Sequence, residues 1–231
     1  MASLNTAFHT EDSAENVLEN RRRFFEMFNY DYRKIVSGIQ VHGTDLAVFD
    51  LANLGEGAAP GSANKKCDAL VTTEKGLSLA AYAADCMLIY MVSTEKPVVA
   101  IAHAGWRGTL GEIGPAVTYF IMQQYGVQPE QLLVSLSPAI CRNCYLVDHD
   151  TAMKFFAAGW KEPPFMEFEE DGTYKLDIKA INREQLYNCG IKENNLDYSS
   201  FCTSCHKEMF YSYRRDLGNT GRMIGFAALK D

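Results

Sequence analysis

The chain has 231 residues, 47% of them hydrophobic and 22% charged, which is enough apolar sequence for one globular domain spanning residues 1–231. Its net charge of -7 argues against a protein that binds nucleic acid or an anionic membrane through a basic face, so any phosphate site has to be local. The sequence shows no signal peptide and no run of about 18 apolar residues, and its seven cysteines are typical of reduced thiols. We therefore expect a cytoplasmic protein.

The first half of the chain predicts one helix followed by short strands. Ser and Asp cap candidates in front of apolar residues at helical spacing predict a helix within residues 10–29. Apolar runs bounded by turn residues predict strands over residues 34–43, 45–50, 77–86, 87–92 and 97–103. The Gly-, Ala- and Pro-rich interval 51–66 is typical of a surface loop.

The second half predicts more helix. Amphipathic spacing indicates helices over residues 109–126, 150–160 and 177–190, the first of them ended by Gly126. Apolar strands are predicted over 131–140 and 222–229. Because the strands cluster and the helices are interspersed irregularly, we predict an α+β fold with a mixed sheet.

Ionisable side chains stand at the ends of three predicted strands. "QVHG" gives His42, "AADC" gives Asp85 and Cys86, and "VVAIAH" gives His103. Two imidazoles and a thiol can converge there, and three protein ligands with an open fourth position are typical of catalytic zinc. The same donors suit copper. Taken singly, each residue is better explained as a core thiol or a hydrogen-bonded histidine, so the pattern alone does not establish the site.

Two basic elements are candidates for anion binding. Gly105 and Gly108 bracket Arg107 in front of a predicted helix, where free N–H groups and the helix dipole favour an anion such as phosphate. The second element is "YSYRRDLGNTGR", with Arg214, Arg215 and Arg222. We expect Arg107 and Arg215 to hold phosphate, although a solvated turn would explain the second element equally well.

The motifs together resemble those of a known family. "QVHG", "DALVT", "ADC", "HAGWRG", "CYLVD", "FCT" and "SYRRDLGNTGR" occur in the order of the YfiH-like family. It is also called the laccase-domain or multicopper polyphenol oxidase family and is now regarded as a family of zinc-dependent purine nucleoside phosphorylases. The resemblance implies a layered α/β/β/α sandwich with mixed sheets, a monomer or weak assembly, and a metal held by His42, Cys86 and His103.

The resemblance also implies the substrates. These are purine nucleosides and phosphate, with phosphorolysis of adenosine, inosine, guanosine and methylthioadenosine, and deamination of adenosine. Deamination needs a proton shuttle near a metal-activated water, and Asp85 is our candidate. One region departs from the family: in "LSPAICRNCYLVD", Ser137 and Cys141 replace glycines, which puts the shape of the neighbouring loop in question.

Several other functions compete with this interpretation. A copper-dependent polyphenol oxidase is the main alternative, although five histidines without a His-x-His pair cannot build the usual multicopper cluster. Cys86 could instead act as a nucleophile with His103 or His42 as base, or the site could belong to a non-enzymatic scaffold. "CTSCH" matches the attachment pattern for c-type haem. Haem of this type is generally attached outside the cytoplasm, and the sequence shows no export signal, so we interpret the match as coincidence.

A four-cysteine zinc site is a further alternative. It would be formed by "CRNC" at 141–144 and "CTSC" at 202–205. The interval between the two pairs far exceeds the roughly 15–20 residues usual for such sites, so we treat it as a minor alternative that a zinc stoichiometry of one or two would decide.

Overall fold

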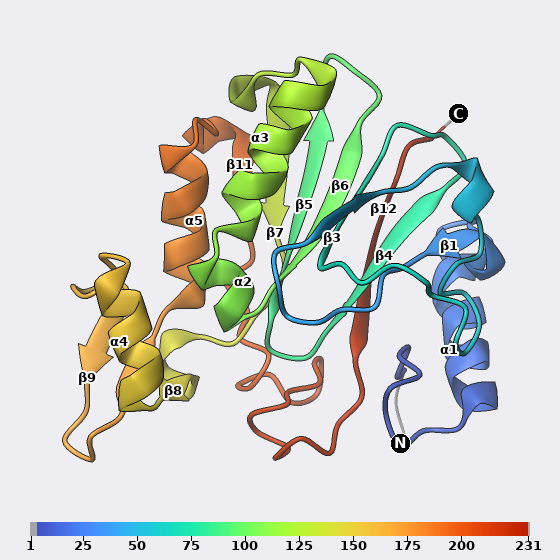
Figure 1. The fold of residues 1–231 in the computed structure, drawn as a ribbon. Helices are drawn as coiled ribbons and strands as arrows, with labels where there is room; N and C mark the ends of the chain where they lie inside the picture. Colours follow the sequence, from blue (N-terminus) through green and yellow to red (C-terminus); the bar gives the residue numbers. More distant parts are fainter. Residues whose placement is uncertain (1–3, 231) are drawn as a thin grey trace.

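The structure, a computed structural model, describes residues 4–230 (Figure 1). Its helices are α1 (Ala14–Glu26), α2 (Trp106–Leu110), α3 (Ile113–Tyr125), α4 (His149–Ala157) and α5 (Ile178–Asn188). Its strands are β1 (Ile35–Val36), β2 (Leu46–Val48), β3 (Ala69–Thr72), β4 (Ser78–Ala83), β5 (Met87–Ser93), β6 (Val99–Ala104), β7 (Leu132–Leu136), β8 (Leu146–Val147), β9 (Met166–Phe168), β10 (Tyr174–Leu176), β11 (Leu196–Tyr198) and β12 (Met223–Ala228).

The strands form three sheets. The largest has six strands in the order β11-β7-β5-β6-β3-β2, and its two outermost pairs are parallel while the inner pairs are antiparallel. A second sheet has the order β1-β4-β12 and a small third sheet the order β8-β10-β9. The predicted α+β class with mixed sheets is confirmed.

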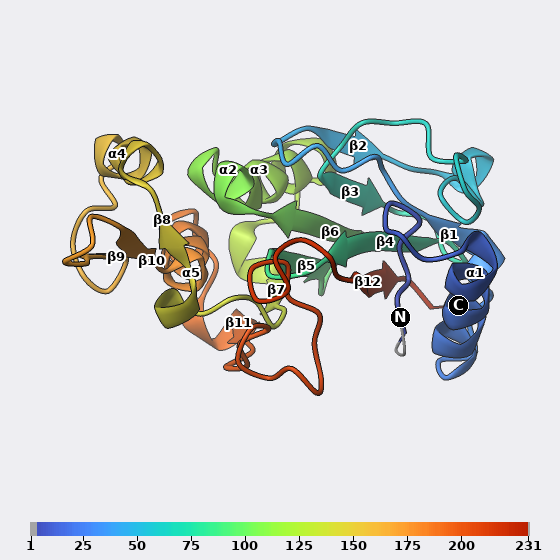
Figure 2. The same cartoon turned by 90° about the horizontal axis from the view of Figure 1, so that it is seen from below.

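Two cores give the molecule its layers, because successive strand residues face opposite sides of a sheet. On one face of the large sheet, Ala100 and Ala102 of β6 pack with Val117 of α3. On the other face, Val99 and Ile101 pack against the second sheet. Helix α1 covers the outer face of that sheet through a separate cluster around the buried Phe25. Figures 1 and 2 show the resulting α/β/β/α order of layers.

The observed elements differ from the predicted ones at particular residues. The helix predicted over 109–126 is split, because Glu112 adopts a left-handed φ of 59° between α2 and α3; Gly126 ends α3 at φ 67° as predicted. The strand predicted over 77–86 ends at Ala83. The small third sheet, β3 and β11 were not predicted, since their strands have only two to four residues. The strand predicted over 34–43 is limited to Ile35–Val36.

The C-terminal loop (residues 199–222) connects β11 to β12 and contains no helix or strand. In Figure 1 it is the red coil that runs beneath the lower ends of β7 and β12. It therefore passes close to the turn between β4 and β5, which joins the two larger sheets. Within residues 4–230, no helix has both the length and the apolar character needed to cross a membrane.

Candidate metal centre

Three of the predicted residues form one cluster between the two larger sheets. The potential ligand atoms of His42, Cys86 and His103 lie within 4.8 Å of one another. His103 is in β6, on the face that Val99 and Ile101 turn toward the second sheet. Cys86 lies in the turn where the chain passes from one sheet to the other. The three donors come together as predicted, although His42 lies in the loop after β1 rather than at the end of a strand.

Asp68, which the sequence analysis did not assign, holds both histidines in place. Its fully buried carboxylate accepts hydrogen bonds from the backbone N–H groups of Val41 (3.1 Å), His42 (3.0 Å) and Gly43 (2.8 Å). It also lies 2.9 Å from Nδ1 of His103. Such a carboxylate behind a histidine is typical of metal sites, because it fixes the ring and leaves Nε2 for the metal. Its signal in the sequence was the acidic residue directly before the buried strand of "DALVT".

The backbone is unusual at two positions in this site. His42 has φ 60° and Asp85 has φ 86°, both in the left-handed region that residues other than glycine seldom adopt. Such conformations persist only where surrounding contacts hold them. Asp68 supplies those contacts at His42, and the C-terminal loop supplies them at Asp85.

The cluster favours a Cys86 thiolate beside a protonated His103, and a metal ion that binds there has to displace the proton from the imidazole. Burial by itself raises the pKa of the Cys86 thiol, but His103 and His42 outweigh it and lower that pKa to about 6. Burial likewise lowers the pKa of His103, but Cys86 and Asp68 raise it to about 9. The thiolate is the form of cysteine that binds metals. One thiolate and two imidazoles fit zinc, and they fit copper as well.

A cavity of about 800 Å³ opens beside the cluster. This volume is typical of sites for small organic ligands. Aromatic rings line it, namely Phe8, Tyr82, Trp106, Tyr145 and Tyr213. Four arginines also line it, namely Arg21, Arg107, Arg214 and Arg222. The acidic chain therefore has a locally basic cavity, as a phosphate site requires.

Arg107 differs from the other three cavity arginines. Arg21, Arg214 and Arg222 each donate hydrogen bonds to backbone carbonyls. Within residues 4–230 the Arg107 guanidinium forms no hydrogen bond or ion pair, and it stacks 4.3 Å from the centre of the Trp106 ring. Its donors are therefore available to a ligand.

The two glycines of "GWRG" are needed for close packing. A Cβ at Gly105 would lie 3.0 Å from the Cys86 sulfur and 3.2 Å from Cδ2 of His42. A Cβ at Gly108 would lie 3.2 Å from the carbonyl oxygen of Gly43. Gly105 thus lets the chain pass directly behind the metal cluster. The phosphate contacts expected of both glycines stay predictions.

Two other predicted residues serve the C-terminal loop. The Asp85 carboxylate accepts hydrogen bonds from Oγ1 of Thr203 (2.6 Å), Oγ of Ser212 (3.0 Å) and the backbone N–H of Arg214 (2.7 Å). Arg215 is not among the residues that line the cavity, and its guanidinium forms an ion pair of 2.7 Å with the neighbouring Asp216. Arg214, on the same loop, lines the cavity instead.

Two neighbouring segments also bear on the site. Gly57, Ala59, Gly61 and Ala63 of the predicted surface loop line the cavity, as does His9, to which the sequence analysis gave no role. Ser137 and Cys141, at which the resemblance implies glycines, cause no backbone strain, because neither has a positive φ. Ser137 accepts a hydrogen bond from the backbone N–H of Leu88 (2.8 Å).

The structure brings together the four cysteines of the alternative that the sequence analysis treated as minor. The sulfur atoms of Cys141, Cys144, Cys202 and Cys205 lie within 4.8 Å of one another. The long interval in sequence did not matter, because β7 and β11 are parallel neighbours and the two pairs follow these strands at the same edge of the sheet. The cysteines of "CTSCH" thus belong to this group.

Comparison with known proteins identifies the family. Residues 1–230 match the family model described as multi-copper polyphenol oxidoreductase laccase. The chain belongs to this family. The resemblance of the sequence motifs to the YfiH-like, or laccase-domain, family is thereby confirmed.

Several relatives from this laccase-like family are similar along the whole chain. Purine nucleoside phosphorylase YlmD of Geobacillus stearothermophilus is 36% identical over 232 residues, which cover 100% of this chain and 85% of that protein. Adenosine deaminase RL5, from an unknown prokaryotic organism, is 30% identical over 96% of this chain and 85% of its own length. The crystal structure of YlmD from G. stearothermophilus superposes with a TM-score of 0.94 at 35% identity, over 100% of this chain and 86% of that one.

Proposed function

We propose that the protein is a purine nucleoside phosphorylase that cleaves adenosine, inosine, guanosine and methylthioadenosine with phosphate and also deaminates adenosine. The observation that carries the proposal is the His42–Cys86–His103 cluster beside a cavity with a free arginine, Arg107. The names of relatives such as the YlmD phosphorylase and the RL5 deaminase support the same chemistry. The seven free thiols support a cytoplasmic location.

The cavity offers separate surfaces for the two substrates. The Arg107 guanidinium would hold phosphate, since it is the cavity arginine whose donors form no internal hydrogen bond within residues 4–230. Arg214 and Arg222 add positive charge that favours an anion. Aromatic rings such as Tyr145 provide stacking surfaces for the purine. A phosphate oxygen then attacks C1′ of the ribose as the bond from C1′ to the purine nitrogen breaks, and positioning of the two substrates lowers the barrier.

His42, Cys86 and His103 would hold zinc, and the ion supplies Lewis-acid chemistry, including activation of water for deamination. Asp68 orients His103 and holds the loop of His42. The shuttle role expected of Asp85 stays a prediction. Its three internal hydrogen bonds support a positioning role, in which Asp85 and the ion-paired Arg215 together hold the C-terminal loop and hence Arg214.

The test is a turnover assay on zinc-loaded protein with adenosine and inosine, with and without phosphate. Chromatography would quantify adenine, hypoxanthine and ribose 1-phosphate. We expect release of base that requires both phosphate and Cys86, whereas Cys189→Ser, a change of a buried thiol outside the cluster, should keep full activity. Base release by Cys86→Ser at the wild-type rate would overturn the proposal.

Copper in the same site is the second candidate, because two imidazoles and a thiolate suit copper and the family model carries that name. Metal analysis of protein purified without added copper separates the two. Oxidation of phenols by copper-loaded protein, together with no phosphorolysis by zinc-loaded protein, would favour the polyphenol oxidase. Activity that survives removal of all metal but not alkylation of Cys86 would favour a cysteine nucleophile.

A further inference from the structure

The four clustered cysteines belong to two Cys-x-x-Cys segments that follow neighbouring parallel strands. Strand β11 pairs with β7, and an isolated bridge between Ala139 and Cys202 continues this pairing beyond the strands. The loop after β7 then carries Cys141 and Cys144, and the C-terminal loop carries Cys202 and Cys205. Both pairs therefore lie at the same edge of the large sheet.

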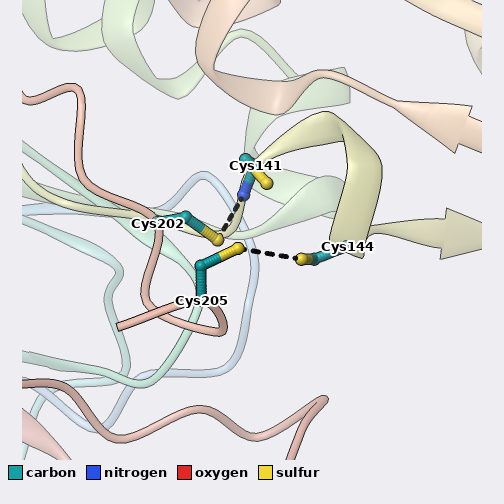
Figure 3. Close-up of side chains that lie close together, drawn as sticks. All are labelled: Cys141, Cys144, Cys202 and Cys205. Carbon is teal, nitrogen blue, oxygen red and sulfur yellow. Dashed lines mark hydrogen bonds between the residues drawn. The ribbon is translucent and has the colours of Figure 1, made fainter. Parts of the chain in front are cut away.

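Figure 3 shows the four side chains gathered around one point. Their sulfur atoms lie within 4.8 Å of one another, and those of Cys144 and Cys205 are 3.4 Å apart. The backbone N–H of Cys141 donates to the sulfur of Cys202 at 3.3 Å. Hydrogen bonds of this kind are common around metal-bound thiolates.

The spacing decides what this group can hold. Four sulfurs at about 2.3 Å from one tetrahedral ion lie about 3.8 Å from each other. This separation lies between the 3.4 Å from Cys144 to Cys205 and the 4.8 Å limit for the whole group. A disulfide needs about 2.0 Å between sulfurs, and all four cysteines are free. An iron–sulfur cluster distributes its cysteines over separate iron atoms and needs a wider spacing. The group is therefore built for a single ion.

We infer that Cys141, Cys144, Cys202 and Cys205 form a structural zinc site, separate from the His-His-Cys cluster and closed by four protein ligands. Thiolates are the ligands that zinc prefers in such sites. The two zinc sites share no residue. This inference does not rest on the proposed activity.

The position of the site shows what the ion does for the fold. It joins the loop after β7 to the C-terminal loop, which has no regular secondary structure of its own. Both loops contribute to the cavity, the first through Tyr145 and the second through Arg214. The Arg214 guanidinium lies 4.9 Å from the centre of the Tyr145 ring, so the tie holds two cavity residues against each other. Four ligands and no open position make this role structural rather than catalytic.

The test measures zinc per chain in the full-length protein, produced with zinc and purified without chelators. We expect the double variant Cys144→Ser/Cys205→Ser to contain one zinc fewer than the wild type. Cys189→Ser, which alters a thiol that donates to the carbonyl of Leu186 at 3.2 Å, should lose none. Cys86→Ser should keep this zinc even where it loses the other, so failure of the proposed function and failure of this inference give different results.

Cobalt substitution of the wild-type protein provides a second readout that needs no folded double variant. Cobalt(II) in a tetrahedral four-thiolate site absorbs strongly in the visible and near-ultraviolet, and we expect this spectrum in the wild type and in Cys86→Ser. A double variant with as much zinc as the wild type would overturn the inference. So would a Cys144–Cys205 disulfide found by mass spectrometry in the wild-type protein as isolated, or the absence of a four-thiolate cobalt spectrum.

Discussion

Substitution of Asp68 by Asn tests whether the buried carboxylate positions the metal cluster. One carboxylate oxygen accepts from the backbone N–H of His42 and contacts Nδ1 of His103; the other accepts from the N–H groups of Val41 and Gly43. An asparagine amide has one oxygen, so its NH₂ group faces either the N–H groups of Val41 and Gly43 or the N–H of His42 together with Nδ1 of His103. Two charge-assisted hydrogen bonds are lost, at about 1.5–3 kcal/mol each, which predicts a loss of about 3–6 kcal/mol in unfolding free energy.

The same change should weaken metal binding. If the amide nitrogen faces His103, the ring keeps its proton on Nε2 and cannot present that atom to a metal. Loss of a carboxylate behind a histidine typically costs about 10–100-fold in metal affinity. Urea denaturation measures the loss of unfolding free energy, and competition with a chromophoric zinc chelator measures the loss of zinc affinity.

Asp45→Asn is the matched control for Asp68→Asn. Asp45 is exposed and its carboxylate forms no hydrogen bond within residues 4–230, so the substitution removes the same charge from the same region without breaking the network. We expect wild-type stability and zinc affinity from it. Equal behaviour of the two variants would refute the positioning role of Asp68.

Three further substitutions test the rest of the site. Gly105→Ala places a methyl group 3.0 Å from the Cys86 sulfur, so zinc content by metal analysis should fall while circular dichroism stays unchanged. Arg107→Ala should raise KM for phosphate by about 10–100-fold and leave KM for the nucleoside nearly unchanged. Arg33→Ala, an exposed arginine paired with a nearby aspartate, is its control, and an unchanged phosphate KM would remove Arg107 from the phosphate site. Asp85→Asn breaks hydrogen bonds to the C-terminal loop and should lower unfolding free energy by about 2–5 kcal/mol in urea; a loss under 1 kcal/mol would contradict its positioning role.

Periodicity predicted the long elements because burial governs them. The apolar spacing of α1 and the continuous apolar run of β6 follow directly from which faces they bury. The small sheet β8-β10-β9 was missed, because two or three residues contain too little periodicity to distinguish a strand from a loop. The split between α2 and α3 was also missed, because it depends on the left-handed conformation of Glu112, which carries no clear sequence signal.

The candidate metal ligands could be predicted because each follows or ends an apolar run of the sequence, although in the structure His42 lies in the loop after β1 and Cys86 in the turn between β4 and β5. Their partner Asp68 could not, because its role depends on which loop folds over it. The four-cysteine group was treated as a minor alternative for a related reason. Spacing rules describe metal sites made of local turns, whereas here the pairing of β7 with β11 brings the two pairs together.

Two buried carboxylates explain how loops without regular structure can form a well-defined site. Asp68 accepts hydrogen bonds from the loop of His42, and Asp85 accepts them from the C-terminal loop that carries Arg214. His42 and Asp85 themselves have left-handed backbones, which cost free energy unless such contacts hold them. The same hydrogen bonds that stabilise these conformations also fix the metal ligand and the arginine relative to one another. The cavity is therefore organised before substrates bind, which is the condition under which positioning can contribute to catalysis.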